Sequence, residues 1–220
     1  MYDTFRRVLL IVVGVPVALL LIGIGTAFAK VKNDIRDSVV IVACLDETGE
    51  PTKFGTGTVI STYQVLTAAH VVTGCSSVET KFFSDLKRKA VIQKIGNPED
   101  FDFAVLALSV PYGVPVIPLS KGVPEQGEHL TLIAHPRGLM WTRVEATVSL
   151  VDTGVADSDM LVDVTSAQGA SGGAMLNAAG EIVGILVAGL MSGPNGGDYT
   201  GFGAVELISN IKKFFPEDLQ

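Results

Sequence analysis

The sequence has 220 residues, with 16 Lys and Arg against 23 Asp and Glu and a formal net charge of −7 at pH 7. A mildly acidic chain without a basic stripe interleaved with aromatic residues is unsuited to binding nucleic acid. His, Cys, Asp and Glu do not cluster at metal-ligand spacing, so we expect neither a metal nor another cofactor.

An uncharged apolar run over residues 8–29 follows two arginines. As a helix it would span about 33 Å, enough for a hydrocarbon core of roughly 30 Å. Its last residues, Ala27-Phe28-Ala29, also match the A-x-A pattern of a signal-peptidase site, although leaders usually have apolar regions of roughly 7–15 residues. We predict either a single-pass membrane anchor or a leader cleaved after Ala29.

The orientation of this segment is not decided by charge, because Lys30, Lys32 and Arg36 follow the run and nearly balance the two arginines before it. The leader-like end and the cysteine pair described below favour a domain outside the cytoplasm. That domain would be membrane-tethered, or secreted or periplasmic after cleavage.

Short apolar runs separated by turn residues follow Arg36 and predict strands. Six precede a proline-rich connector and six follow it. They are Ser38–Leu45, Lys53–Ile60, Gln64–Thr67, Val78–Phe83, Lys89–Ile95 and Phe103–Leu108, then Leu130–Ala134, Thr142–Leu150, Met160–Val164, Gly173–Leu176, Ile182–Ala188 and Thr200–Val205.

This order of elements predicts an all-β fold of two packed six-stranded antiparallel barrels. A parallel α/β sheet would need helical crossovers that the intervals between the runs do not offer. Apolar residues at helical spacing after Val205 predict a C-terminal capping helix. We place the N-terminal segment at 1–30, the first barrel at 31–115, and the second barrel with the helix at 116–220.

The stretch Gly169-Ala170-Ser171-Gly172-Gly173 fits G-x-S-x-G. This pattern occurs in the nucleophile elbow of α/β-hydrolases, around the nucleophile of β-barrel serine peptidases, and by chance in flexible turns. In α/β-hydrolases the triad histidine follows the serine. All three histidines here precede Ser171, which excludes the elbow.

The order His, Asp, Ser remains available. His70 lies in the segment "VLTAAHVV", where small residues after a strand would let an imidazole face a cleft. Asp102 lies directly ahead of an apolar strand, and Asp100 is the competing acid if the register shifts. His135 is interpreted as a loop residue and His129 as solvent-facing or at a strand edge.

The segments "GTGTVIS…VLTAAHVV", "DFAVLAL" and "QGASGGAML" resemble trypsin-like serine peptidases in order and spacing, from Val39 to Phe215. The segment "GEHLTLIAHPRGLMWTRVEATVS" looks like the second barrel of the bacterial high-temperature-requirement (HtrA-like) proteases. The resemblance implies peptide-bond cleavage by a triad of His70, Asp102 and Ser171, with the N–H groups of Gly169 and Ser171 as the oxyanion hole.

The residue types suit that chemistry, because a serine hydroxyl needs a base to take its proton. His70 would be the base, and Asp102 would orient its imidazole and stabilise its charged form. Ala170 departs from the aspartate of zymogen-type relatives, so activation by N-terminal trimming is not expected. No PDZ-like module is expected after the helix.

The family alignment also implies a primary specificity pocket. Its floor would be Thr165, and its walls would lie near Gly189 and Gly201. Without a carboxylate at the floor, a buried Lys or Arg would be unpaired, so we expect cleavage after uncharged residues. Val187 to Gly189 would pair with the substrate as an added strand, which favours extended or unfolded polypeptides.

Two hypotheses remain beside the triad assignment. The two cysteines, Cys44 and Cys75, are expected to form a disulfide, the alternative being two buried thiols in a cytosolic domain. A membrane-tethered barrel that binds peptides without cutting them is the competing function, and labelling of Ser171 by a fluorophosphonate would separate it from a protease.

Overall fold

The computed structural model describes residues 34–97, 101–111, 113–155, 158–192 and 198–214. The apolar run at 8–29, predicted to be an anchor or a leader, and the alternative acid Asp100 lie outside these residues. Within the described ranges, no helix has the length and apolar character needed to cross a bilayer.

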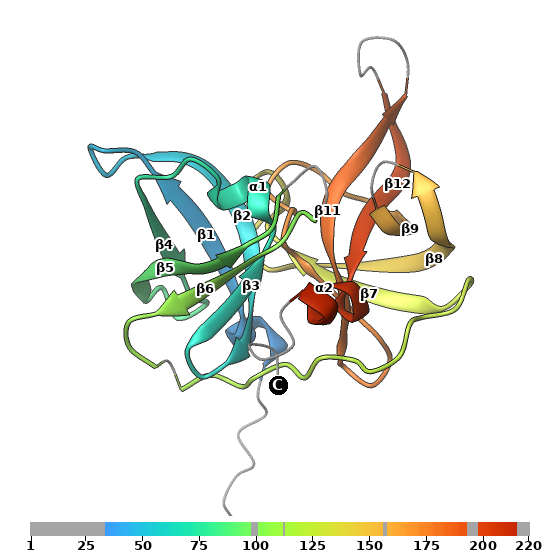
Figure 1. Ribbon diagram of the computed structural model, residues 1–220, viewed down its shortest axis with the longest axis horizontal. Helices are drawn as coiled ribbons and strands as arrows, with labels where there is room; N and C mark the ends of the chain where they lie inside the picture. The colour runs from blue at the N-terminus through green and yellow to red at the C-terminus, as the bar shows by residue number, and fades with distance from the viewer. Residues whose placement is uncertain (1–33, 98–100, 112, 156–157, 193–197, 215–220) are drawn as a thin grey trace, which may run out of the picture. The chain divides into compact units, whose positions relative to one another are not determined.

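The first six strands close into one antiparallel barrel in the order β1-β2-β3-β6-β5-β4 (Figure 1). Their bounds are β1 (Val39–Leu45), β2 (Pro51–Ser61), β3 (Gln64–Thr67), β4 (Ser77–Lys81), β5 (Lys87–Ile95) and β6 (Ala104–Leu108). A 3-10 turn, η1 (Ile35–Ser38), precedes β1, and a four-residue helix, α1 (Ala69–Val72), follows β3.

The last six strands close into a second antiparallel barrel in the order β10-β11-β12-β9-β8-β7. Their bounds are β7 (His129–Ala134), β8 (Thr142–Val155), β9 (Ser158–Val164), β10 (Ala174–Leu176), β11 (Ile182–Ser192) and β12 (Asp198–Leu207). A 3-10 turn, η2 (Pro136–Gly138), lies between β7 and β8, and helix α2 (Ile208–Phe214) follows β12.

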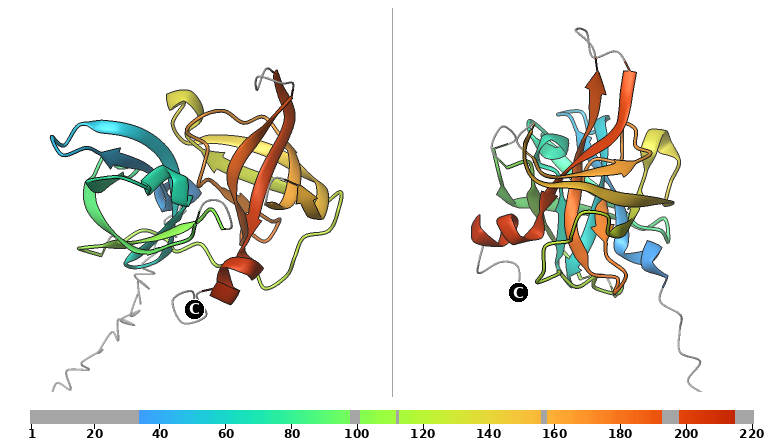
Figure 2. Two further views of the ribbon diagram at one scale, coloured as in Figure 1. Left: turned by 45° about the horizontal axis from the view of Figure 1, so that its top comes forward. Right: turned by 90° about the vertical axis from the view of Figure 1, so that its right-hand side faces the viewer.

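The two barrels lie side by side, as Figure 1 and the left view of Figure 2 show, and they share apolar packing. One buried cluster joins first-barrel residues such as Leu66 and Leu106 to second-barrel residues such as Ile185, and to Ile211 of α2. A second cluster fills the interior of the second barrel. The contact between the barrels is therefore part of the hydrophobic core.

The all-β prediction is confirmed, and each predicted strand overlaps an observed one. The largest differences in length are in β8, β11 and β12, which extend beyond the predicted runs. The outer part of β11 is exposed, including Ala188, Gly189 and Met191. It pairs with β12 through its backbone, and an apolar pattern does not report such pairing.

Candidate active site

His70 and Asp102 are brought together by the pairing of β3 with β6. Thr67 lies opposite Ala104, so the residues just after β3 face those just before β6. The His70 N–H donates to Asp102 Oδ1 at 2.8 Å, and His70 Nδ1 lies 2.5 Å from Asp102 Oδ2. The imidazole is 41% exposed and the carboxylate 13%. The acid therefore orients the ring, whose other nitrogen remains accessible.

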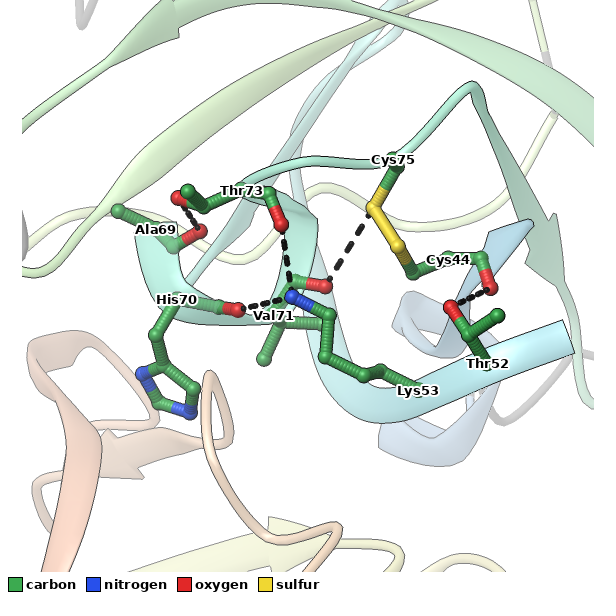
Figure 3. Close-up of a disulfide and its surroundings, with 8 residues drawn as sticks. All are labelled: Cys44, Thr52, Lys53, Ala69, His70, Val71, Thr73 and Cys75. Carbon is green, nitrogen blue, oxygen red and sulfur yellow. Dashed lines mark hydrogen bonds between the residues drawn. A yellow bond between two sulfur atoms is a disulfide. The ribbon is translucent and has the colours of Figure 1, made fainter. Parts of the chain in front are cut away.

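The helical turn that carries His70 is held from behind (Figure 3). Lys53 Nζ donates to the carbonyl oxygens of His70 and Thr73, at 3.0 and 2.7 Å. A cation suits the C-terminal end of a helix, where carbonyl oxygens lack intrahelical donors. A disulfide joins Cys44 of β1 to Cys75, just beyond the turn, with the Cα atoms 5.2 Å apart. These contacts fix the turn to β1 and β2.

Ser171 lies in the loop before β10, on the second barrel. Its hydroxyl donates to the carbonyl oxygen of Val187 at 3.4 Å, and within the described residues it has no hydrogen bond to His70. Ser171 and His70 nevertheless line the same cavity of about 580 Å³. The structure thus gathers His70, Asp102 and Ser171 at the junction of the barrels, with the serine turned towards β11.

The loop that contains Ser171 has its carbonyl groups engaged in hydrogen bonds. Every carbonyl oxygen from 167 to 171 accepts a hydrogen bond of 2.7–3.0 Å. The Ala170 N–H donates to the oxygen of residue 167, the Arg137 N–H to that of 168, and the Gly173 N–H to that of 170. Thr56 donates to the other two, through its hydroxyl to the oxygen of residue 169 and through its N–H to that of 171. By contrast, the N–H groups of Gly169 and Ser171 meet no acceptor in the described part of the chain. Two unpaired donors beside a hydroxyl are the arrangement that stabilises an oxyanion.

Two glycines allow this loop to lie so close to its neighbours. Gly169 has φ of +95°, and a Cβ there would stand 2.6 Å from the carbonyl oxygen of His135. Gly172 has φ of +83°, and a Cβ there would overlap the carbonyl oxygen of Thr56. Both positions therefore exclude a side chain on conformation and on space.

A second cavity of about 290 Å³ lies on the other side of Ser171. Residues of the loop, of β11 and of β12 form it, and they are Ser166, Ala167, Gln168, Leu186, Ala188, Gly189, Met191 and Tyr199, with Arg137 at its edge. Among the described residues that line it there is no carboxylate. Its size and place next to Ser171 suit a substrate side chain.

The predicted pocket residues are only partly found there. Gly189 lines the cavity, whereas Thr165 is exposed and lines neither cavity beside Ser171. Ser166 and Ala167, the next two residues after Thr165, line the cavity instead. Gly201 lies outside both cavities, and Val187 contacts Ser171 through its backbone oxygen without lining the smaller cavity.

The other two histidines differ in their surroundings. His129 is exposed at the start of β7, as predicted. His135 follows β7 in a loop but is 4% exposed, and its Nδ1 accepts a hydrogen bond from the Trp141 N–H at 2.9 Å. Burial lowers the pKa of His135 to about 4, so the ring is neutral at pH 7. In the described part of the chain, no group of three or more His, Cys, Asp or Glu side chains is arranged to hold a metal.

A family model described as the trypsin-like peptidase domain matches residues 55–185. The chain belongs to this family. The matched range contains all three candidate triad residues and the loop with the two unpaired N–H groups.

Named relatives agree with this membership. The chain is 25% identical over 190 residues to a probable periplasmic serine endoprotease, DegP-like, of Buchnera aphidicola subsp. Baizongia pistaciae, covering 82% of this chain and 40% of that protein. It is 28% identical over 153 residues to a probable periplasmic serine protease, do/HhoA-like, of Haemophilus influenzae, covering 66% of this chain and 32% of that protein. The chain thus spans about two fifths or less of the length of these relatives.

The crystal structure of the Rv3671c protease in an inactive form has the same fold. The TM-score is 0.65, with 23% identity over 81% of this chain and 87% of that one.

Several features of this trypsin-like domain were not predicted from its sequence. Tyr199 and Lys53 lie at the site but belong to none of the motifs that were found, and Arg137 lies in a quoted segment but was given no role. Glu206 was also missed. It is 3% exposed on β12, and its Oε1 accepts a weak hydrogen bond of 3.4 Å from the Asp102 N–H. An acid within an otherwise apolar strand, "FGAVELI", is the one sequence signal for it.

Proposed function

We propose that this trypsin-like domain is a serine endopeptidase that hydrolyses peptide bonds through His70, Asp102 and Ser171. The observation that carries the proposal is the pair of N–H groups of Gly169 and Ser171. Among the described residues these groups have no acceptor, and they lie beside a hydroxyl and a histidine that is oriented by an acid. A loop that only packed against the barrel would be expected to use these donors, since buried or part-buried polar groups are normally paired.

The reaction begins when the Ser171 hydroxyl turns from Val187 O towards His70. Rotation about χ1 exchanges the staggered rotamers of the serine and redirects its hydroxyl. His70 Nε2 takes the hydroxyl proton while Oγ attacks the peptide carbonyl carbon. The oxyanion that forms accepts hydrogen bonds from the Gly169 and Ser171 N–H groups, and Asp102 stabilises the imidazolium.

Collapse of this tetrahedral intermediate breaks the C–N bond. His70 returns the proton to the leaving amine, and Ser171 keeps the acyl group as an ester. A water molecule then gives one proton to His70 and attacks the ester, which releases the new carboxylate. His70 returns that proton to Ser171, so the enzyme ends in its starting state.

The substrate we infer is an extended polypeptide with an uncharged side chain before the scissile bond. β11 pairs with β10 only as far as Ile185, so the edge of Val187 to Gly189 that faces away from β12 is open to an added strand. The smaller cavity offers no carboxylate among its described residues. Arg137 at its edge, without an ion pair in the described part of the chain, disfavours a basic side chain further.

The test combines covalent labelling with peptide hydrolysis. A fluorophosphonate should label the wild-type chain at Ser171, and a peptide library should show cleavage after uncharged residues. Ser171→Ala and His70→Ala should each lower the rate by up to about 10⁶-fold, and Asp102→Asn by about 10⁴-fold, the value known for the same change in the chymotrypsin-type triad. Absence of both labelling and cleavage in the folded protein would refute the proposal.

A second function is supported by one observation, the hydrogen bond from Ser171 to Val187 in place of His70. A peptide-binding barrel without catalysis would keep the serine in this position. Such a protein would bind extended peptides with measurable affinity and would leave the fluorophosphonate unreacted.

We also propose that the domain lies outside the cytoplasm. The Cys44–Cys75 disulfide supports this location, because disulfides persist in oxidising compartments, and two relatives are named as periplasmic. Mass spectrometry of non-reduced protein from cells should find the two cysteines linked. Free thiols on both would count against this location, and fractionation of the full-length chain with membranes would distinguish an anchor from a cleaved leader.

A further inference from the structure

Thr56 of β2 is a buried polar residue that the proposed reaction does not use. It is 0% exposed and lies between Gly55 and Gly57 where the first barrel faces the second. A Cβ at Gly55 would stand 3.0 Å from the carbonyl oxygen of Ser171, so the strand passes very close to the loop that carries the nucleophile.

The Thr56 hydroxyl links two segments of the second barrel. It accepts a hydrogen bond from the His135 N–H at 3.1 Å and donates to the Gly169 carbonyl oxygen at 2.8 Å. The Thr56 N–H donates to the Ser171 carbonyl oxygen at 2.8 Å. The Thr56 carbonyl oxygen in turn accepts from the Thr67 hydroxyl at 2.7 Å. All the polar groups of this residue are therefore engaged.

We define the oxyanion loop as residues 168–172. The bonds from Thr56 act together with bonds from Arg137 and Gly173 to hold the peptide units of this loop. Because a trans peptide unit is planar, holding its C=O also fixes the direction of the N–H in the same unit. The bond from Arg137 to Gln168 O thus orients the Gly169 N–H, and the bond from Gly173 to Ala170 O orients the Ser171 N–H. Thr56 holds the two remaining units of the loop from the other barrel.

We propose that Thr56 is a positioning residue that holds the N–H groups of Gly169 and Ser171 in the geometry that binds the oxyanion. The inference rests on the proposed function, since the geometry matters most when charge develops on the substrate oxygen. A side chain of the first barrel would thus help to form the oxyanion site of the second barrel.

The neighbouring Thr58 provides a matched control. It lies two residues further along the same strand, on the same face, and is also 0% exposed. Its hydroxyl is buried without a hydrogen-bond partner in the structure. Replacing it by the isosteric valine removes a hydroxyl of the same type and burial without touching the oxyanion loop.

The experiment compares Thr56→Val, Thr56→Ser and Thr58→Val in the full chain, using a peptide that the wild-type protein cleaves. Thr56→Val should lower kcat by about 10²-fold with KM within a few-fold of wild type, because the bonds lost act on the transition state. A peptide aldehyde, whose adduct places an oxygen in the oxyanion site, should lose affinity in parallel. Thr56→Ser should restore most of kcat, and Thr58→Val should match wild type.

Thr56→Ala serves as a second variant without the hydroxyl. In Thr56→Val a methyl group takes the place of the hydroxyl next to Gly169 O, whereas alanine leaves this space open to water. Near-ultraviolet circular dichroism would give the folded fraction to which each kcat is referred. A folded Thr56→Val or Thr56→Ala with kcat close to that of Thr58→Val would overturn the inference.

Amide hydrogen exchange over residues 166–173 separates failure of this inference from failure of the proposed function. Exchange in this segment should be faster in Thr56→Val than in Thr58→Val, whether or not the wild-type chain cleaves peptides. Faster exchange in Thr56→Val together with an inactive wild-type chain would support the role of Thr56 in holding the loop and refute the proposed protease activity. Equal exchange in the two variants would refute the role of Thr56.

Discussion

Glu206 is buried against two other carboxylates, Asp159 and Asp102, and this environment controls its protonation. Burial raises the pKa of Glu206 to about 8, and the charge of Asp159 and a side-chain hydrogen bond with it add to the effect. The Asp102 N–H, which bonds to Glu206 Oε1, acts in the opposite direction. The folded protein therefore carries a neutral acid behind Asp102 at pH 7.

This raised pKa makes stability depend on pH. Between pH 4.5 and about 8 the unfolded chain releases the Glu206 proton while the folded chain keeps it, so the free energy of unfolding falls as pH rises through this window. Glu206→Gln mimics the protonated acid and should be about 2–4 kcal/mol more stable than wild type at pH 8 and nearly equal to it at pH 5.

Urea denaturation at the two pH values measures this difference. His135 has the opposite dependence, since its lowered pKa weakens the fold as pH drops from 6.5 to about 4, but it contributes equally to both proteins and cancels. Glu145→Gln, at an exposed position of β8, is the control for replacing a glutamate by glutamine. An equal effect of Glu206→Gln at both pH values would contradict the assignment.

Tyr199 sets the width of the smaller cavity. Its hydroxyl donates to Val164 O at 2.5 Å, and its ring lies against Gly189, where a Cβ would stand 2.9 Å from the ring. We expect Tyr199→Ala to raise kcat/KM for peptides with a large aromatic residue before the scissile bond, relative to valine, by about tenfold. Tyr199→Phe keeps the ring and should keep the preference.

A peptide library run on each variant provides the measurement. Tyr63→Ala removes an exposed tyrosine of the first barrel and should leave the preference unchanged. If Tyr199→Ala also left it unchanged, the smaller cavity would not be the specificity pocket.

The residues of the site differ in how far the sequence indicated them. His70, Asp102 and Ser171 stand in local motifs whose order excluded an α/β-hydrolase, and they lie together in the structure. Thr165 was placed by counting along the chain from Ser171, which does not show which way the loop turns. Tyr199 and Thr56 act through contacts between strands far apart in sequence, and no local pattern encodes those contacts.

At the scale of elements, the strands were predictable because most are bounded by turn residues and at least half buried. Two backbone features were not predicted: the residues around His70 form the helical turn α1, and β11 with β12 continues beyond the predicted runs as an exposed ribbon. Neither feature changes the apolar spacing. The short turn before β10, in contrast, is dictated by its glycines.

Gly172, in the turn before β10, and Gly180, outside it, allow a test of whether this turn requires glycine. Both have positive φ, +83° and +77°, so alanine at either position costs about 1–2 kcal/mol. At Gly180 the added Cβ has nothing within 4 Å, whereas at Gly172 it meets Thr56 O, Thr67 Oγ1 and the Ala68 N–H. Gly180→Ala should lose about 1–2 kcal/mol and stay active.

Gly172→Ala should lose clearly more stability than Gly180→Ala, by a further ~2 kcal/mol, because the neighbouring atoms are mostly backbone and cannot move aside. It should also lose most of its activity, as the loop is pushed from the first barrel. Thermal unfolding and peptide hydrolysis of the two variants measure these effects. Equal losses in both would mean that the contact with Thr56 is easily relieved.

At the scale of the whole molecule, the two barrels are joined by a common apolar cluster and by polar bonds across their contact. The single tryptophan of the chain, Trp141, adds to them, since its indole N–H donates to the carbonyl oxygen of Val39 in β1 at 2.8 Å. The two barrels therefore pack against each other through both apolar and polar contacts.

We therefore expect residues 34–214 to unfold in one cooperative transition. Trp141 fluorescence reports the contact between the barrels, and far-ultraviolet circular dichroism reports the strands of both. The two signals should change at the same urea concentration. If the fluorescence changed first, the barrels would separate before they unfold, and the common cluster would contribute less than its burial indicates.

The division of the site between the barrels also fixes when an active molecule can exist. A chain that leaves the ribosome, or crosses a membrane, with its N-terminus first exposes His70 and Asp102 well before the strands that flank Ser171. The first barrel contains neither Ser171 nor Gly169, and the loop that carries them accepts hydrogen bonds from Thr56 of the first barrel. Under the proposed function, a nascent or translocating chain is harmless to its own synthesis and export machinery, and order of emergence gives it the protection that an inhibitory propeptide gives other proteases.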